Sequence, residues 1–266
     1  MDDLPDHTIT PQSVADVAPS TSVPTGSNTP TPVSAVLVLL LYFALQIAVA
    51  LAWTLLQRNV GTHIPALATA LHSPSLMLSM VLLLAALPVL ALVRLHWRSL
   101  WSVGALPGLG VRWPGWRWLL GGLLLAALLL PLVMGVNALL FPRQGVTQSV
   151  LVVFDQAHLL MRVLLTALIV LLAPFVEELL FRGLLLAGLA QRMRLRLAVS
   201  LSVALFALAH LPDTSGHWQV LPGLLLLALG LTWLRLRSGS LLPGWAAHAL
   251  YNASVLSLAL APLLRR

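Results

Sequence analysis

Long apolar runs, separated by short segments that hold most of the charged residues, extend from residue 35 to near the end of the chain. An α-helix needs about 20 apolar residues to cross a bilayer, and most of these runs reach about that length. The pattern therefore predicts an all-α fold, a polytopic transmembrane helical bundle of about seven spans. The spans are predicted at about residues 35–56, 75–93, 118–140, 162–187, 197–211, 218–234 and 241–262, the fifth and sixth being short.

The first 34 residues follow a different pattern. They are poor in apolar residues and rich in proline and threonine, which is typical of a disordered segment. They are also acidic and lack a basic region ahead of an apolar one, so they do not resemble a secretory signal peptide. We therefore divide the chain into a disordered N-terminal tail, residues 1–34, and a transmembrane helical domain, residues 35–266.

The composition supports a membrane protein. Hydrophobic residues make up 59% of the chain and charged residues 9%, whereas about 25% of an average soluble domain is charged. The net charge of +7 comes from arginines between the apolar runs, so it indicates membrane topology and lipid contact rather than nucleic-acid binding. The chain contains no cysteine, which excludes disulfides, thiolate metal ligands and a cysteine nucleophile.

The arginines are distributed unevenly between the two ends of the predicted bundle. The loops after the second, fourth and sixth spans lie on the side of the N-terminus and hold most of them, whereas Arg58, Arg143 and Arg162 lie on the other side. Positively charged loops stay in the cytosol, so this distribution predicts a cytosolic N-terminus. Arg265 and Arg266 at the carboxyl end run against this orientation.

The only two glutamates, Glu177 and Glu178, are adjacent and lie within an apolar run, residues 171–190. A charged side chain at the centre of a transmembrane helix costs about 2.5 kcal/mol or more, so an acid there usually serves a function. Residues four apart share a helix face, so Glu178 can pair with Arg182, whereas Glu177 is rotated by about 100° and faces elsewhere. Pro174 is expected to loosen the helix and free a carbonyl near the acids. A buried ion pair with a spare acid is the structural alternative.

Polar side chains on two later spans complete a candidate catalytic set. His210 follows Phe206 by one turn in the fifth span, and His248 and Asn252 share one face of the seventh. A single buried histidine is more often a helix–helix hydrogen bond, but the similar depth of these residues and Glu177 would let one cavity receive them all. A carboxylate and an imidazole can activate a water, while a second imidazole and an amide can stabilise an oxyanion. This combination suits amide hydrolysis.

Other chemistries leave different signatures. The chain has no HExxH, no GxSG and no aspartate in a predicted span, which argues against the other intramembrane proteases that use those patterns. Two histidines and two glutamates could still bind zinc, although pairing of Glu178 with Arg182 would remove one ligand. We therefore favour a metal-free site and keep zinc as the alternative. A transporter relaying protons through Glu177 and His210 is a further class, but no paired inverted repeats are visible in the sequence.

Three motifs together resemble a known family. Residues 177–182 read EExxxR, residues 206–210 read FxxxH and residues 248–252 read HxxxN, in this order and on separate predicted spans. The set resembles the CPBP family, which groups CAAX prenyl endopeptidases with bacteriocin-processing and immunity-type (Abi-type) membrane proteins. The resemblance covers about residues 160–260, which we take as the protease core.

The resemblance implies catalytic roles for four residues. Glu177 would be the base that activates a water, and His210 would assist it. His248 and Asn252 would form the site that stabilises the oxyanion. The substrates would be membrane-associated peptides or proteins, prenylated CAAX-type proteins among them.

The resemblance also implies supporting residues and a cellular setting. Glu178 and Arg182 would be structural or would tune the base, and Phe206 would pack beside the water site. The family has been described both as metalloproteases and as glutamate proteases, so the resemblance leaves zinc open. It further implies a multi-pass protein of the bacterial cytoplasmic membrane, with a non-catalytic immunity or scaffold protein as the alternative.

Overall fold

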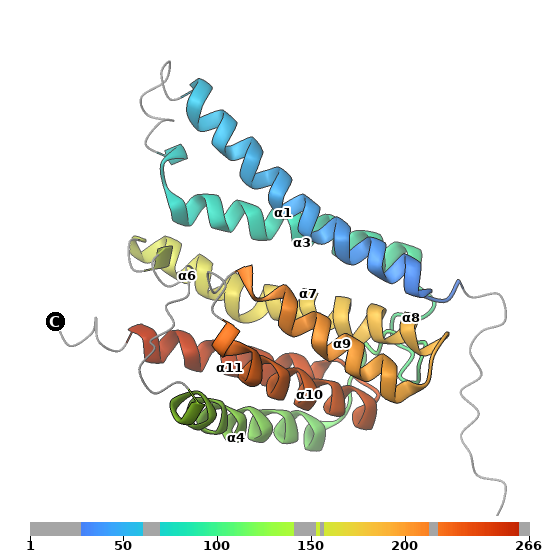
Figure 1. Ribbon diagram of the computed structural model, residues 1–266. Helices are drawn as coiled ribbons and strands as arrows, with labels where there is room; N and C mark the ends of the chain where they lie inside the picture. Colours follow the sequence, from blue (N-terminus) through green and yellow to red (C-terminus); the bar gives the residue numbers. More distant parts are fainter. Residues whose placement is uncertain (1–27, 61–69, 141–152, 155–156, 213–217, 261–266) are drawn as a thin grey trace, which may run out of the picture.

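The computed structural model describes residues 28–60, 70–140, 153–154, 157–212 and 218–260, and every regular element within these ranges is helical. Figure 1 shows the helices running roughly along one direction. The all-α helical bundle predicted from the sequence is therefore confirmed. The elements are α1 Pro32–Val60, α3 Pro74–His96, α4 Trp116–Leu140, α6 Leu159–Ala167, η1 Leu168–Leu172, α7 Ala173–Glu178, η2 Leu179–Leu185, α8 Leu186–Ala190, α9 Leu195–Ala209, η4 Trp218–Val220, α10 Leu221–Ser238 and α11 Leu242–Leu260.

The helices have the length and composition that a membrane requires. Within the described ranges, 5 helices are long and apolar enough to cross one. The fifth predicted span is the shorter helix α9, of 15 residues, and the seventh is α11, of 19 residues. Each predicted span thus coincides with a helix. The five long helices are Pro32–Asn59, Pro74–His96, Trp116–Leu140, Leu159–Ala190 and Trp218–Ser238.

The outward faces of these helices are apolar. Leu37 and Leu51 on α1, and Leu124 and Leu128 on α4, are each about 60% exposed. Soluble proteins rarely expose large contiguous apolar surfaces, whereas lipid tails accept them. The outer surface therefore fits an integral membrane protein in contact with lipid.

The first helix begins earlier than the sequence suggests. α1 starts at Pro32, inside the predicted tail of residues 1–34. Proline suits the first helical turn, because an N–H there would have no partner within the helix. Ser34 N–H donates to the Thr31 hydroxyl over 3.1 Å and Thr31 N–H to the Ser34 hydroxyl over 2.9 Å, as in a capping box. The sequence did not predict this cap because its residues have low hydrophobicity. Residues 1–27 of the predicted tail lie outside the described residues.

Two groups of helices pack on either side of the segment Leu159–Ala190. α1 and α3 lie side by side on one side, and α4, α10 and α11 pack together on the other (Figure 1). The largest buried cluster joins α1 and α3 to residues 176–189 and α9, and a second joins α4, α10 and α11. Gly122 on α4 lies against the Pro243 carbonyl where a Cβ atom would not fit, so α4 can approach α11 closely.

Candidate active site

The helical segment that carries the two glutamates is not a regular α-helix. Between Leu159 and Ala190, two π-helical stretches, η1 and η2, flank the short helix α7. In a π-helical turn each N–H bonds the carbonyl five residues earlier, and such turns are frequent at functional sites. The N–H of Ala173 bonds the Leu168 carbonyl in this way. The acids therefore lie on a short α-helical turn between two widened ones.

Pro174 accounts for a free carbonyl in η1. Proline has no N–H, so the Ile169 carbonyl, five residues earlier, lacks its π-type backbone partner. The side-chain amide of Asn252 on α11 donates to this carbonyl instead, over 3.1 Å. The expectation that Pro174 frees a carbonyl near the acids thus agrees with the structure. That carbonyl also orients Asn252.

A second side chain of α11 bonds the same stretch. The indole N–H of Trp245 donates to the Leu171 carbonyl over 2.9 Å. Trp245, His248 and Asn252 are spaced by three and four residues, so they share one face of α11, and this face lies along η1. We did not select Trp245 from the sequence. Its position seven residues before Asn252, on the same helix face, could have indicated this role.

Glu177 faces both histidines of the motifs. Its Oε2 atom lies 3.5 Å from His210 Nε2 and 3.7 Å from His248 Nε2. This oxygen is buried and has no hydrogen-bond partner among the residues that the structure describes. Glu177, both histidines and Asn252 line one cavity of about 600 Å³, which fits the expectation that three separate spans deliver these side chains to one place.

His210 has its ring held by the backbone. It follows the last residue of α9, and its Nδ1 lies 2.8 Å from the Phe206 carbonyl. A carbonyl only accepts, so Nδ1 carries the proton. In the neutral ring, Nε2 is then an acceptor whose lone pair is directed to the side of Glu177.

Glu178 and Arg182 form the ion pair that their spacing predicts. Arg182 Nη1 donates to Glu178 Oε1 over 2.8 Å, and both side chains are fully buried. Arg182 also donates from Nη2 to the Ala228 carbonyl over 3.2 Å and from Nε to the Thr232 hydroxyl over 3.4 Å. The guanidinium is therefore fixed between α10 and the glutamate helix.

His248 joins the two acids. Its Nδ1 lies 3.3 Å from Glu178 Oε1, the oxygen that also accepts from Arg182. The carboxylate accepts, so Nδ1 carries the proton and Nε2 is turned to Glu177. Gly244, one turn earlier on α11, permits this contact, because a Cβ there would lie 2.9 Å from Glu178 Oε2. We did not expect this bond, since the sequence links Glu178 only to Arg182.

Phe206 lies at the centre of these side chains. Its ring centroid is 4.4 Å from that of His210 and 5.7 Å from that of His248. The guanidinium carbon of Arg182 lies 4.1 Å above the same ring, a cation–π contact. Phe206 thus packs beside both imidazoles and the buried cation.

The polar residues can be tested as zinc ligands. A catalytic zinc site usually needs three protein ligands, about 2.0–2.2 Å from the metal for nitrogen and oxygen. Glu178 is bound to Arg182 and directed away from the cavity, which leaves Glu177 and two imidazoles. Among the described residues, no group of three or more His, Cys, Asp or Glu side chains is arranged to hold a metal ion. Glu177, His210 and His248 would therefore be the donors available to a zinc ion at this site.

Comparison with known proteins agrees with the motifs. Residues 159–254 match the model of a family described as Type II CAAX prenyl endopeptidase Rce1-like. The matched segment includes all the motif residues selected from the sequence. Comparisons with curated proteins and with solved structures gave no match. The similarity thus rests on the part of the chain that carries the polar residues of the cavity.

Proposed function

We propose that this chain is a CAAX-type intramembrane protease, as the match of residues 159–254 to the Rce1-like family model suggests, and that it hydrolyses peptide bonds with a water activated by Glu177. The observation that carries the proposal is the buried Oε2 of Glu177, which has no hydrogen-bond partner and faces the Nε2 atoms of two histidines. Protease activity and a membrane setting follow from the family. The mechanism and the substrate are the proposal.

The water would be held between Glu177 and His210. The ionised carboxylate is an acceptor, and neutral His210, with its Nδ1 proton on the Phe206 carbonyl, presents a second acceptor at Nε2. A water has two O–H donors, so it can bond both and direct its lone pairs at a substrate carbonyl. As the new C–O bond forms, Glu177 takes a proton from the water and then delivers it to the leaving amine.

His248 and Asn252 would stabilise the oxyanion. Glu178 holds the Nδ1 proton of His248, so a protonated ring would present Nε2–H to the substrate carbonyl oxygen. Asn252 uses one amide N–H on the Ile169 carbonyl and has a second one to donate. Fixed donors of this kind typically contribute about 10²–10³-fold to the rate. Arg182 and Glu178 would act as positioning residues.

The cavity also suits a membrane-associated substrate. Its remaining wall is mostly apolar and includes Tyr42, Phe43 and Ile47 of α1 and Met77 and Val81 of α3. We propose membrane-associated peptides or proteins as substrates, with prenylated CAAX-type sequences as the first to test. The arginine distribution supports a cytosolic N-terminus, in the bacterial cytoplasmic membrane that the resemblance implies.

A cleavage assay in liposomes tests the proposal. Wild type, Glu177→Gln and the control Gln46→Ala, which changes the same cavity from α1, are compared on a quenched prenylated peptide and on a panel of membrane peptides. We expect cleavage by wild type and the control, and a loss of at least about 10³-fold in Glu177→Gln, because the base and the water site are both removed. Glu177→Gln with wild-type activity would end the mechanism.

A chelator separates the metal-free mechanism from the zinc alternative. Cleavage that depends on Glu177 and persists with a strong chelator would support a glutamate protease. Cleavage that the chelator abolishes, and that added zinc restores, would assign the site to a metal. Absence of cleavage by wild type across the whole panel would favour the non-catalytic immunity or scaffold role.

A further inference from the structure

One end of the bundle gathers arginines from several elements. They lie at the end of α3, in the α3–α4 loop and the first turn of α4, at the turn between α8 and α9 and the start of α9, and at the end of α10. These segments meet at one end of the molecule (Figure 1). Of the 8 acidic residues in the chain, the structure describes two: Glu177, which lines the cavity of the candidate active site, and Glu178, which is paired with Arg182. No carboxylate side chain among the described residues therefore neutralises this end. Its arginines are Arg94, Arg98, Arg112, Arg117, Arg192, Arg194, Arg196, Arg235 and Arg237.

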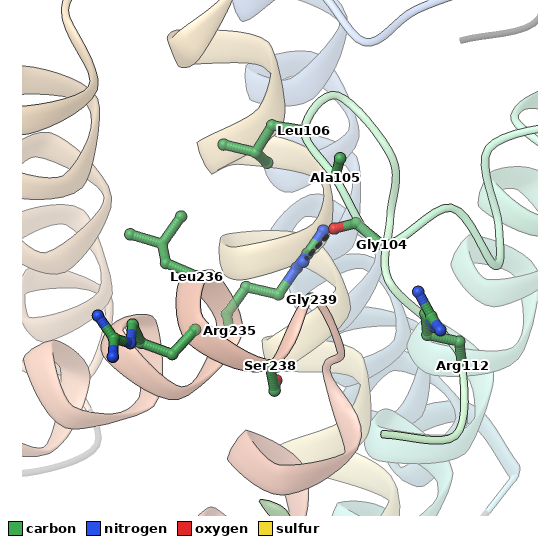
Figure 2. Close-up of a pocket in the computed structure, with 9 residues that line it drawn as sticks. Gly104, Ala105, Leu106, Arg112, Arg235, Leu236, Ser238 and Gly239 are labelled. Carbon is green, nitrogen blue, oxygen red and sulfur yellow. Dashed lines mark hydrogen bonds between the residues drawn. The ribbon is translucent and has the colours of Figure 1, made fainter. Parts of the chain in front are cut away.

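A cavity of about 320 Å³ lies within this end. It is separate from the catalytic cavity and is formed by residues 104–106 of the α3–α4 loop and residues 235–239 at the end of α10, together with Arg112 (Figure 2). Its charged lining consists of Arg112, Arg235 and Arg237. Three cations around one small cavity create a positive potential there, which favours an anion.

Arg235 is the buried member of the three. Its side chain is 1% exposed and reaches from α10 to the loop, where Nη1 donates to the Gly104 carbonyl over 2.7 Å (Figure 2). Its Nη2 donates to the Gly108 carbonyl over 2.6 Å. Its Nε atom is buried and has no hydrogen-bond partner within the described part of the chain. Carbonyls satisfy N–H donors but do not cancel a unit charge, and an uncompensated buried charge is costly.

The second guanidinium meets the first at Gly104. A Cβ atom on Gly104 would lie 2.8 Å from Arg112 Nη1, so the Arg112 side chain rests directly on the residue whose carbonyl binds Arg235. The loop also wraps Arg235 closely, because a Cβ on Gly110 would lie 2.7 Å from its Cζ atom and Gly110 has a φ of +77°. Gly104 therefore contacts both guanidiniums, and an anion bound in the cavity would lower the repulsion between these like charges.

We propose that this cavity binds an anionic phosphate group, supplied by the headgroup of an anionic phospholipid. The planar donor fork of arginine matches phosphate oxygens, and basic pockets between transmembrane helices at the membrane surface bind phospholipid headgroups. A purely structural tie between α10 and the loop explains the two carbonyl bonds of Arg235. It does not explain why Arg112 and Arg237 line the same cavity with no carboxylate among the described residues.

Binding can be measured without disturbing the buried residue. The full chain is reconstituted in nanodiscs of zwitterionic phosphatidylcholine, and phosphatidylglycerol is titrated while thermal stability and bound lipid are followed by unfolding and native mass spectrometry. The pocket variant is Arg112→Gln with Arg237→Gln, both exposed side chains. The control is Arg192→Gln with Arg196→Gln, also exposed and at the same end but outside the cavity, with the same change in net charge.

We expect phosphatidylglycerol to stabilise wild type and control saturably and to bind the pocket variant at least about tenfold more weakly, because charge-assisted hydrogen bonds are removed. A parallel titration with glycerol phosphate shows whether the bound phosphate group comes from a lipid headgroup or from a soluble molecule. Tight binding of the soluble phosphate, lost in the pocket variant, would support the site but assign it a soluble ligand. Phosphatidylglycerol binding that is weakened equally in the pocket variant and the control variant would overturn the proposal. So would a wild-type protein that does not prefer phosphatidylglycerol over phosphatidylcholine.

Discussion

Glu178 and Arg182 are both fully buried, and this burial determines what a substitution costs. The same carboxylate oxygen accepts from Arg182 over 2.8 Å and lies 3.3 Å from Nδ1 of His248. Removing one partner of a buried ion pair leaves the other charge uncompensated and costs about 3–5 kcal/mol. Glu178 therefore stabilises the fold and orients the imidazole, whereas Glu177 faces the cavity.

We expect Glu178→Gln to lower the unfolding temperature of the purified protein and to reduce proteolysis less completely than Glu177→Gln, since the water site stays in place. Adding Arg182→Met removes the unpaired cation and should recover part of the lost stability. Thermal unfolding in detergent and initial cleavage rates measure the two effects. An unfolding temperature of Glu178→Gln equal to that of wild type would contradict the role of the pair.

How far the sequence predicts this site differs from one contact to the next. The Glu178–Arg182 pair follows from spacing within one helix, because residues four apart share a face. The contact from His248 to Glu178 joins two helices, and periodicity on either helix does not specify their rotation relative to one another. The two acids were therefore assigned to different faces correctly, but the imidazole that lies between them was assigned only to the oxyanion.

At the scale of the element, the widened turns around α7 decide where the acids and the amide lie. The Ile169 carbonyl accepts from Asn252, and the Leu171 carbonyl accepts from Trp245. Both bonds fix the register of α11 against η1. Sequence patterns assume 3.6 residues per turn, so they predict the helix and its proline but not the π-helical stretches.

We expect Pro174→Ala to lower the cleavage rate by about 10²-fold while the unfolding temperature stays level or rises. Alanine restores an N–H that can bond the Ile169 carbonyl, which would displace Asn252, and a displacement of about 1 Å can cost 10²-fold in rate. Pro88→Ala, within α3, is the matched control, since it also removes a proline from a helix interior. Cleavage rates and unfolding temperatures of both variants test whether Pro174 is needed to position Asn252. Full activity of Pro174→Ala would show that the widened turn is not required.

At the scale of the whole molecule, the cavity that Glu177 lines combines the helices that carry the motifs with helices outside the matched segment. The motifs lie within residues 159–254, but α1 and α3 supply much of the apolar wall, through side chains such as Ile47 and Met77. The helices and the motif residues were predicted from hydropathy and spacing. The pairing of α1 with α3, and their place against the cavity, did not, because lipid-facing and cavity-facing leucines look alike in sequence.

The same asymmetry of arginines that forms the basic cavity predicts the orientation of the whole protein. The chain has no cysteine, so single cysteines can be introduced without any background reaction. Ser102, in the α3–α4 loop, and Asn59, at the far end of α1, are both exposed and lie at opposite ends of the bundle. We expect a membrane-impermeant maleimide added to intact cells to label Asn59→Cys but not Ser102→Cys, and to label both after permeabilisation, because the arginine-rich end stays in the cytosol. Labelling of Ser102→Cys alone in intact cells would invert the orientation and place the basic cavity at the outer surface.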